Sequence, residues 1–263
     1  MSKSMKFQVL LCCSVFLFCG FSRYEKPKNT EGTVILKFNN LFNKEALDFE
    51  KAYTNAHGEK VKFTLLNYFI SNIKLTKEDG STYAVPQDSS YFLVKQSDPA
   101  SKEITLNHIP SGKYSALTFT IGVDSLRNTM GIGSRTGALD VGATAKGMYW
   151  VWNSGYIFFK LEGTSPAAPE KQKNVFNYHI GGFGGYRSKT MNNIKTRTLA
   201  FKPVVVSNRK GPVIDINVEI DHFFDQVNPI KIAEKSSVMW GEFSTKISEN
   251  YVSIFNLGNV SSK

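Results

Sequence analysis

Cysteine is almost absent from this chain of 263 residues. Its three cysteines, Cys12, Cys13 and Cys19, all lie close to the N-terminus. A mature domain without them has no disulfide and no thiolate to offer a metal ion. Any metal site in that domain would therefore use histidine, methionine, carboxylate or modified aromatic side chains.

Several functional signals are also missing. The formal net charge of +10 is dispersed along the chain, with no long run of like charge and no basic–aromatic array. This pattern argues against nucleic-acid binding and indicates a solvated surface or association with anionic lipid or an acidic partner. The sequence has no nucleophile elbow, no spaced metallohydrolase motif and no recognisable triad, so we expect a protein that is not an enzyme.

The N-terminus has the composition of a secretory signal peptide, which we place at residues 1–22. Lys3 and Lys6 precede an apolar stretch, residues 9–18, that is too short to span a bilayer. The mature protein is therefore expected in the periplasm or cell envelope. Lipidation of Cys19 is an alternative, although the residue before it is bulky where a small one is usual.

The rest of the chain is large enough for one domain with a substantial core. We expect a polar tether at residues 23–32, a β-sandwich domain at residues 33–255 and a polar tail at residues 256–263. Helical periodicity is scarce, with short helical turns expected only at Ser125–Met130 and His222–Val227.

Segments rich in β-branched and aromatic residues recur along the chain and predict strands. Phe63–Ile70 and Asn72–Thr76 are expected to form one long or bulged strand, and Asp79-Gly80 is a hairpin signal leading into Ser81–Val85. The other expected strands are Thr33–Phe38, Tyr91–Lys95, Glu103–Leu106, Tyr114–Val123, Tyr149–Leu161, Val175–Ile180, Thr198–Pro203, Val213–Ile220 and Val238–Phe243. The pattern predicts an all-β fold, an antiparallel β-sandwich for which the immunoglobulin fold is one candidate topology.

A long glycine-rich loop, Gly131–Gly147, interrupts this pattern. Loops of this length in compact domains are often functional or mobile, and the alternative is an Ω-loop that packs over the sheet edge. The loop leads directly into Met148, Tyr149 and Trp150.

Two of the three tryptophans, Trp150 and Trp152, are only two positions apart, which would place both on one face of a strand. If Tyr149–Leu161 pairs with Val175–Ile180, His179 is expected near Ile157 and hence near the tryptophans. A bulge at residues 153–155 would reverse the upstream faces. The alternative role for His179 is structural, with its ring bonded to a backbone carbonyl.

Several segments resemble the MbnP-like family of bacterial copper-binding envelope proteins. These are Leu66–Leu75, Ile121–Asn128, Gly137–Asp140, Gly147–Gly163 and His179–Gly181. The resemblance extends from about Thr33 to past Phe224. It implies an exported β-protein that binds copper through histidines and an oxidised tryptophan, kynurenine, and that has a dihaem peroxidase-like partner of the MbnH type.

The resemblance assigns site residues one by one. Trp150, Trp152 and His179 match the family motif, whereas Asn128 matches without the histidine that follows it in the copper-binding branch. Met130 and Met148 flank the glycine-rich loop, and a thioether suits Cu(I), although each also fits as a core residue. The expected function is copper binding, preferentially as Cu(I), and the alternative is a β-sandwich that binds a non-metal ligand or a partner.

Overall fold

The computed structural model describes residues 30–152, 155–208 and 211–261. The expected signal peptide, Cys19 and most of the expected tether lie outside the described residues. The first strand begins at Glu31, slightly before the predicted domain start. In the described part of the chain, no helix has the length and apolar character needed to cross a membrane.

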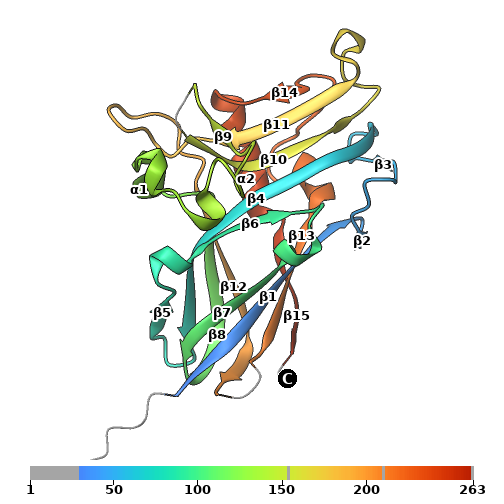
Figure 1. The fold of residues 1–263 in the computed structure, drawn as a ribbon. Helices are drawn as coiled ribbons and strands as arrows, with labels where there is room; N and C mark the ends of the chain where they lie inside the picture. Colours follow the sequence, from blue (N-terminus) through green and yellow to red (C-terminus); the bar gives the residue numbers. More distant parts are fainter. Residues whose placement is uncertain (1–29, 153–154, 209–210, 262–263) are drawn as a thin grey trace, which may run out of the picture.

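Strands dominate the described chain (Figure 1). The longer ones are β1 (Glu31–Phe42), β4 (Lys60–Lys77), β6 (Tyr91–Lys95), β7 (Glu103–Pro110), β8 (Gly112–Ile121), β10 (Gly155–Thr164), β11 (Val175–Gly181), β12 (Lys195–Val206), β13 (Val213–Glu219) and β15 (Phe255–Ser261). The short ones are β2 (Glu45–Ala46), β3 (Tyr53–Thr54), β5 (Thr82–Ala84), β9 (Tyr149–Trp150) and β14 (Ser237–Val238). Two α-helices, α1 (Ser125–Thr129) and α2 (Glu242–Ser253), complete the main elements.

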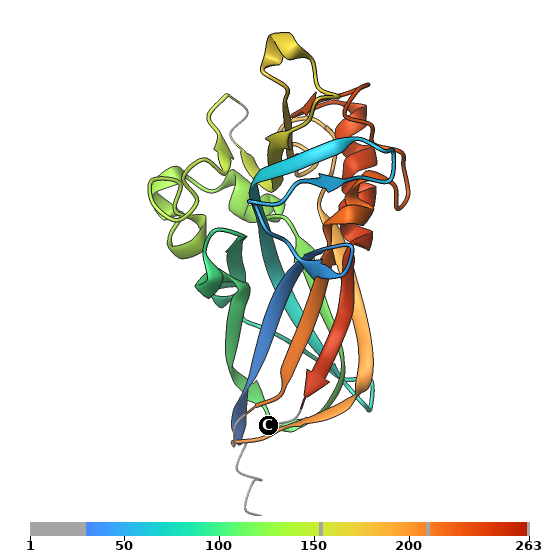
Figure 2. The ribbon, with the colours of Figure 1, turned by 90° about the vertical axis from the view of Figure 1, so that its right-hand side faces the viewer.

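The strands form two sheets. The smaller has the order β15-β13-β1-β2, with β7 also pairing with β1. The larger has the order β12-β8-β4-β10-β11-β14, with β3, β5 and β6 on β4, and β9 on β10. The end of β15 and the tip of the β10–β11 hairpin lie at opposite ends of the molecule (Figures 1 and 2).

This arrangement confirms the all-β sandwich. The expectation of purely antiparallel pairing is wrong for two pairs, because β1 pairs with β13 and β11 with β14 in parallel. Both pairs join segments that are far apart in the sequence. Such strands meet after long connections, so no tight hairpin forces them to run in opposite directions.

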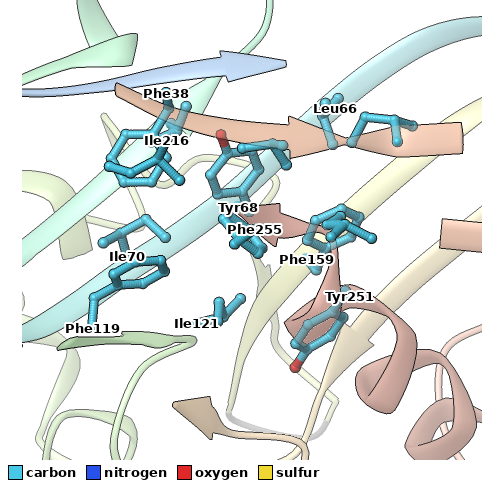
Figure 3. Packing of buried hydrophobic residues seen from close by; sticks show 14 of the residues in the cluster. Phe38, Leu66, Tyr68, Ile70, Phe119, Ile121, Phe159, Ile216, Tyr251 and Phe255 are labelled. Atoms are coloured by element: carbon cyan, nitrogen blue, oxygen red, sulfur yellow. The ribbon is translucent and has the colours of Figure 1, made fainter. Parts of the chain in front are cut away.

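The main core lies between the two sheets (Figure 3). Phe38 on β1 makes edge contacts with Tyr68 on β4 and Phe119 on β8, both at ring-centre distances of 6.1 Å. The ring of Phe159 on β10 stacks on Tyr68 at 5.7 Å and on Tyr251 of α2 at 5.3 Å. These contacts join both sheets and the helix into one aromatic core.

Strand β4 contains the bulge that its sequence suggested. Asn72 has a φ of 50°, and the pairing of β4 with β8 shifts register between Ser71 and Lys74. The shift lets both Ile70, before the bulge, and Ile73, after it, face the main core. The prediction of one long or bulged strand is therefore confirmed.

A second core lies on the other face of the larger sheet, since Phe69 enters it while its neighbours Tyr68 and Ile70 enter the main core. The glycine-rich loop contributes Leu139 and Ala145, both buried. The loop is therefore packed over the sheet, as in the alternative that the sequence left open.

Two predicted strands are wrong. Tyr149–Leu161 divides into β9 and β10, which pair with each other. Val238–Phe243 is also not one strand, because β14 ends at Val238 and helix α2 begins at Glu242.

The expected polar tail at residues 256–263 is also wrong, because β15 (Phe255–Ser261) pairs with β13 at the edge of the smaller sheet. An edge strand exposes much of its surface, which explains its polar composition. Helix α2 was missed because its buried face includes the polar residues Ser244, Ser248 and Asn250.

Candidate tryptophan site

All three tryptophans of the chain gather at one place. The rings of Trp150 and Trp152 are 5.2 Å apart, and Trp240 lies 6.3 Å from Trp150 and 6.4 Å from Trp152. Trp150 is 5% exposed and Trp152 is 63% exposed. The cluster therefore extends from the second core to the surface.

The short β9–β10 hairpin places the first two rings. Trp150 lies on β9 opposite Gly155, whereas Trp152 lies beyond the end of β9. The two side chains are therefore close, as expected, although the expected shared face of one continuous strand is wrong. Trp240 follows β14, and no local pattern in the sequence marked it as a neighbour.

Two adjacent glycines of the β11 segment make room for the indoles. A Cβ added at Gly181 would lie 2.7 Å from a ring carbon of Trp150 and 2.4 Å from the carbonyl oxygen of Tyr156. Gly182 has a φ of 109°, and a Cβ there would approach Trp240 at 3.4 Å. The Trp150 ring lies so close to the backbone that only glycine fits at position 181.

His179 is on the same side of β11 as this indole contact. Tyr178 and Ile180 face the main core, so His179 and Gly181 face the opposite side. The pairing differs from the expectation, since His179 is opposite Lys160 while Ile157 is opposite Gly181. The difference arises at the hairpin tip, because the strands close at the Thr164–Val175 pair and the connection between them is not centred on Pro166–Pro169.

The His179 imidazole has a carboxylate partner. Its Nε2 lies 2.7 Å from Oε1 of Glu162, and the Lys160 ammonium is 3.3 Å from the same oxygen. A backbone carbonyl, the partner expected for a purely structural histidine, is therefore not the contact at Nε2. Glu162 was missed, although counting back along the hairpin from the Thr164–Val175 pair would have placed it on this face.

Burial lowers the pKa of His179, and the positive charge of Lys160 lowers it further against the opposing influence of Glu162. The neutral ring is thus favoured at neutral pH. Because a carboxylate accepts hydrogen bonds, the proton belongs on Nε2 and a lone pair is left on Nδ1. Metal-binding histidines commonly have this arrangement, in which a carboxylate orients the ring through its other nitrogen.

The two methionines occupy different surroundings. Met148 is buried in the second core with Trp150. The sulfur of Met130 lies 3.0 Å from an Nη1 of Arg127, a neighbouring cation that disfavours a metal ion at that sulfur. Met148 therefore lies in the core that contains Trp150, whereas Met130 lies at Arg127.

Asn128 and Thr129 have structural contacts. The Asn128 side chain accepts from the Tyr156 backbone N–H at 2.9 Å and donates to the Val123 carbonyl at 2.6 Å. The Thr129 hydroxyl donates to the Ser125 carbonyl at 2.8 Å. Asn128 therefore joins α1 to β10, and Thr129 bonds within α1.

The donor set fits a copper ion in part. His179 supplies one neutral, oriented imidazole beside an aromatic cluster. Within residues 30–261, excluding the gaps, no group of three or more His, Cys, Asp or Glu side chains could hold a metal ion. A copper ion here would have a single imidazole from these residues and would be held weakly unless a thioether or modified indole joined it.

The fold and site define an all-β sandwich protein with a surface-reaching tryptophan cluster beside an oriented histidine. The chain belongs to the MbnP family, whose sequence pattern matches residues 31–240. A similar solved structure is MbnP from Methylosinus trichosporium, with 15% sequence identity and a TM-score of 0.48, covering 81% of this chain and 82% of that chain. No curated protein matches this sequence.

Proposed function

We propose that this chain is an exported protein of the cell envelope that binds one copper ion, preferentially as Cu(I), beside its tryptophan cluster. Membership of the MbnP family supports this proposal. The observation that carries it is the His179 imidazole, which Glu162 orients at 2.7 Å on the side of β11 that contacts Trp150.

Each residue has a defined task in this proposal. His179 offers Nδ1 as the donor, and Glu162 holds the Nε2 proton and the ring orientation. An ion held on this face, near the Trp150 ring at Gly181, would be partly shielded from water, which favours Cu(I) over the more strongly hydrated Cu(II). When bound, copper would supply one-electron redox chemistry next to oxidisable indoles. Met130 and Met148 stay predictions as additional soft ligands.

We also propose that a dihaem peroxidase-like partner of the MbnH type oxidises one tryptophan of the cluster, with hydrogen peroxide as the oxidant that accepts the electrons. The oxidation opens the C2–C3 bond of the indole, and hydrolysis then releases C2 as formate to leave kynurenine. Trp152 is 63% exposed, so a docked partner can reach it. Trp150 lies 5.2 Å away and is buried, so the exposed ring offers a route to it. Conversion to kynurenine would replace an indole with an aniline and a ketone, which adds a ligand that the unmodified cluster does not have.

Titration of the mature protein with Cu(I) under reducing conditions tests the metal proposal. Wild type is expected to take up one equivalent, and His179→Ala is expected to bind at least tenfold more weakly. His108→Ala is the matched control, because His108 is exposed and paired with Glu31 on the other sheet. No stoichiometric copper in wild type, or equal binding by His179→Ala, would contradict the proposal.

Protein purified from its native envelope tests the partner and the location. Peptide mass spectrometry is expected to find kynurenine at Trp150 or Trp152 when the dihaem partner is present and unmodified tryptophan when its gene is deleted. The N-terminal mass distinguishes cleavage after residue 22 from lipidation at Cys19. Recovery of the full-length chain in the cytosol would refute export.

A further inference from the structure

A cavity of about 430 Å³ lies beside the tryptophan cluster and shares Trp240 with it. Its wall is built mainly from the end of α1, the segment that follows it, and residues within 183–190, which follow β11. Four aromatic side chains line it, namely Tyr149, Phe183, Tyr186 and Trp240. This volume and this wall are typical of a site for a small organic molecule with a flat apolar body.

The cavity wall also contains a buried arginine. Arg135 is 7% exposed, and its guanidinium lies 4.6 Å from the ring centre of Tyr149 and 5.1 Å from that of Tyr156. Nη2 donates to the carbonyls of Asn128 and Met130, each at 2.9 Å. These contacts hold the guanidinium at the wall, but none of them comes from a negatively charged group.

One nitrogen of this guanidinium, with its two N–H donors, is unused. Nη1 of Arg135 is buried and has no hydrogen-bond partner, and no carboxylate of the described chain forms an ion pair with Arg135. A buried cation without an anionic partner is unfavourable, so such groups are usually paired or bind a ligand. A carboxylate at the wall would supply the missing acceptor, and arginine binds carboxylates with two parallel hydrogen bonds.

The charged side chains in the cavity wall are all positive. Arg187 is a second cation in the lining, and no aspartate or glutamate is among the lining residues. We propose that this cavity binds a small organic carboxylate, with the carboxylate at Arg135 and a flat apolar body between the aromatic side chains. This inference concerns a site separate from His179 and does not depend on copper binding.

Calorimetric titration of the mature wild-type protein with indole-3-propionate and with its uncharged amide tests the inference. The two probes have the same ring and differ in charge at one end. The acid is expected to bind at least tenfold more tightly than the amide. Equal binding of acid and amide, or no binding of the acid at millimolar concentration, would overturn the proposal.

Variants assign the carboxylate to the arginines. Arg135→Gln is expected to weaken binding of the acid at least tenfold and to leave the amide unchanged. If that variant does not fold, Arg187→Gln, at an exposed position, is expected to weaken the acid about threefold. Lys189→Gln is the matched control, because it removes one positive charge from the same segment outside the lining. An equal loss in Lys189→Gln and the arginine variant would contradict a specific site.

Copper and carboxylate binding can fail separately in these experiments. His179→Ala is expected to bind indole-3-propionate as wild type does, and Arg135→Gln or Arg187→Gln is expected to bind copper as wild type does. Loss of carboxylate binding in His179→Ala would contradict a separate site.

Discussion

Replacement of Phe159 by alanine tests the packing of the main core. Phe159 is fully buried on β10, and its ring is nearly parallel to those of Tyr68, Phe223 and Tyr251 at 5.7, 5.5 and 5.3 Å. Truncation of a buried phenylalanine to alanine costs about 3–5 kcal/mol. The three ring partners come from three different parts of the chain, namely β4, the turn at Phe223 and helix α2. Because these parts cannot all move inward to fill the space left by the ring, we expect the upper part of this range, about 4–5 kcal/mol.

Urea melts of the mature protein, followed by circular dichroism, would measure the free energy of unfolding. Phe159→Leu keeps most of the apolar volume and is expected to lose about 1–2 kcal/mol, since it loses mainly the ring stacking. Tyr186→Ala is the exposed aromatic control, at 75% exposure, and is expected to change stability by less than about 0.5 kcal/mol. A loss of less than about 1 kcal/mol in Phe159→Ala would refute the packing described for this ring.

Three further changes test other parts of the structure. Asn250→Ala should lower the free energy of unfolding by about 2–4 kcal/mol in urea melts. The reason is that the buried Asn250 amide forms hydrogen bonds with the backbone of Phe223, at 2.9 Å, and of Asn228, at 2.7 Å. An unchanged urea midpoint would contradict this. Gly181→Val should cost about 1–3 kcal/mol or more and shift tryptophan emission, because its side chain would overlap Trp150; wild-type emission and stability would contradict the close contact. The pKa of His179 is lowered in the folded protein, so the unfolded chain takes up the proton first as the pH falls below about 6.5. Wild type should therefore lose stability over this range, and His179→Gln should lose less, as measured by melts at a series of pH values. Identical dependence of stability on pH in the two proteins would contradict a neutral His179 ring in the folded state.

The sequence predicted much of the sheet structure because its strands alternate clearly. The Asp79-Gly80 turn and the bulged β4 follow from local chemistry, and both are present. Helix α2 has apolar residues at helical spacing, including Ile247 and Tyr251, but the polar residues on its buried face weakened the pattern. Local patterns also do not specify which distant strands pair, so the parallel β1–β13 contact was not predictable.

The site was predicted in part. Trp150 and Trp152 are in contact as expected, because they are close in the sequence. Trp240 and Arg135 were missed, since each joins its neighbours only through tertiary folding. The exact partner of His179 depended on where the β10–β11 hairpin closes, at the Thr164–Val175 pair, which composition does not reveal.

X-ray absorption at the copper edge tests the central claim most directly, because it identifies the atoms bound to the metal. For the mature wild-type protein loaded with Cu(I), we predict scattering from one imidazole ring, which should disappear in His179→Ala and persist in His108→Ala. An unchanged copper spectrum in His179→Ala, or a wild-type spectrum without imidazole scattering, would contradict a copper site at His179 beside the tryptophan cluster.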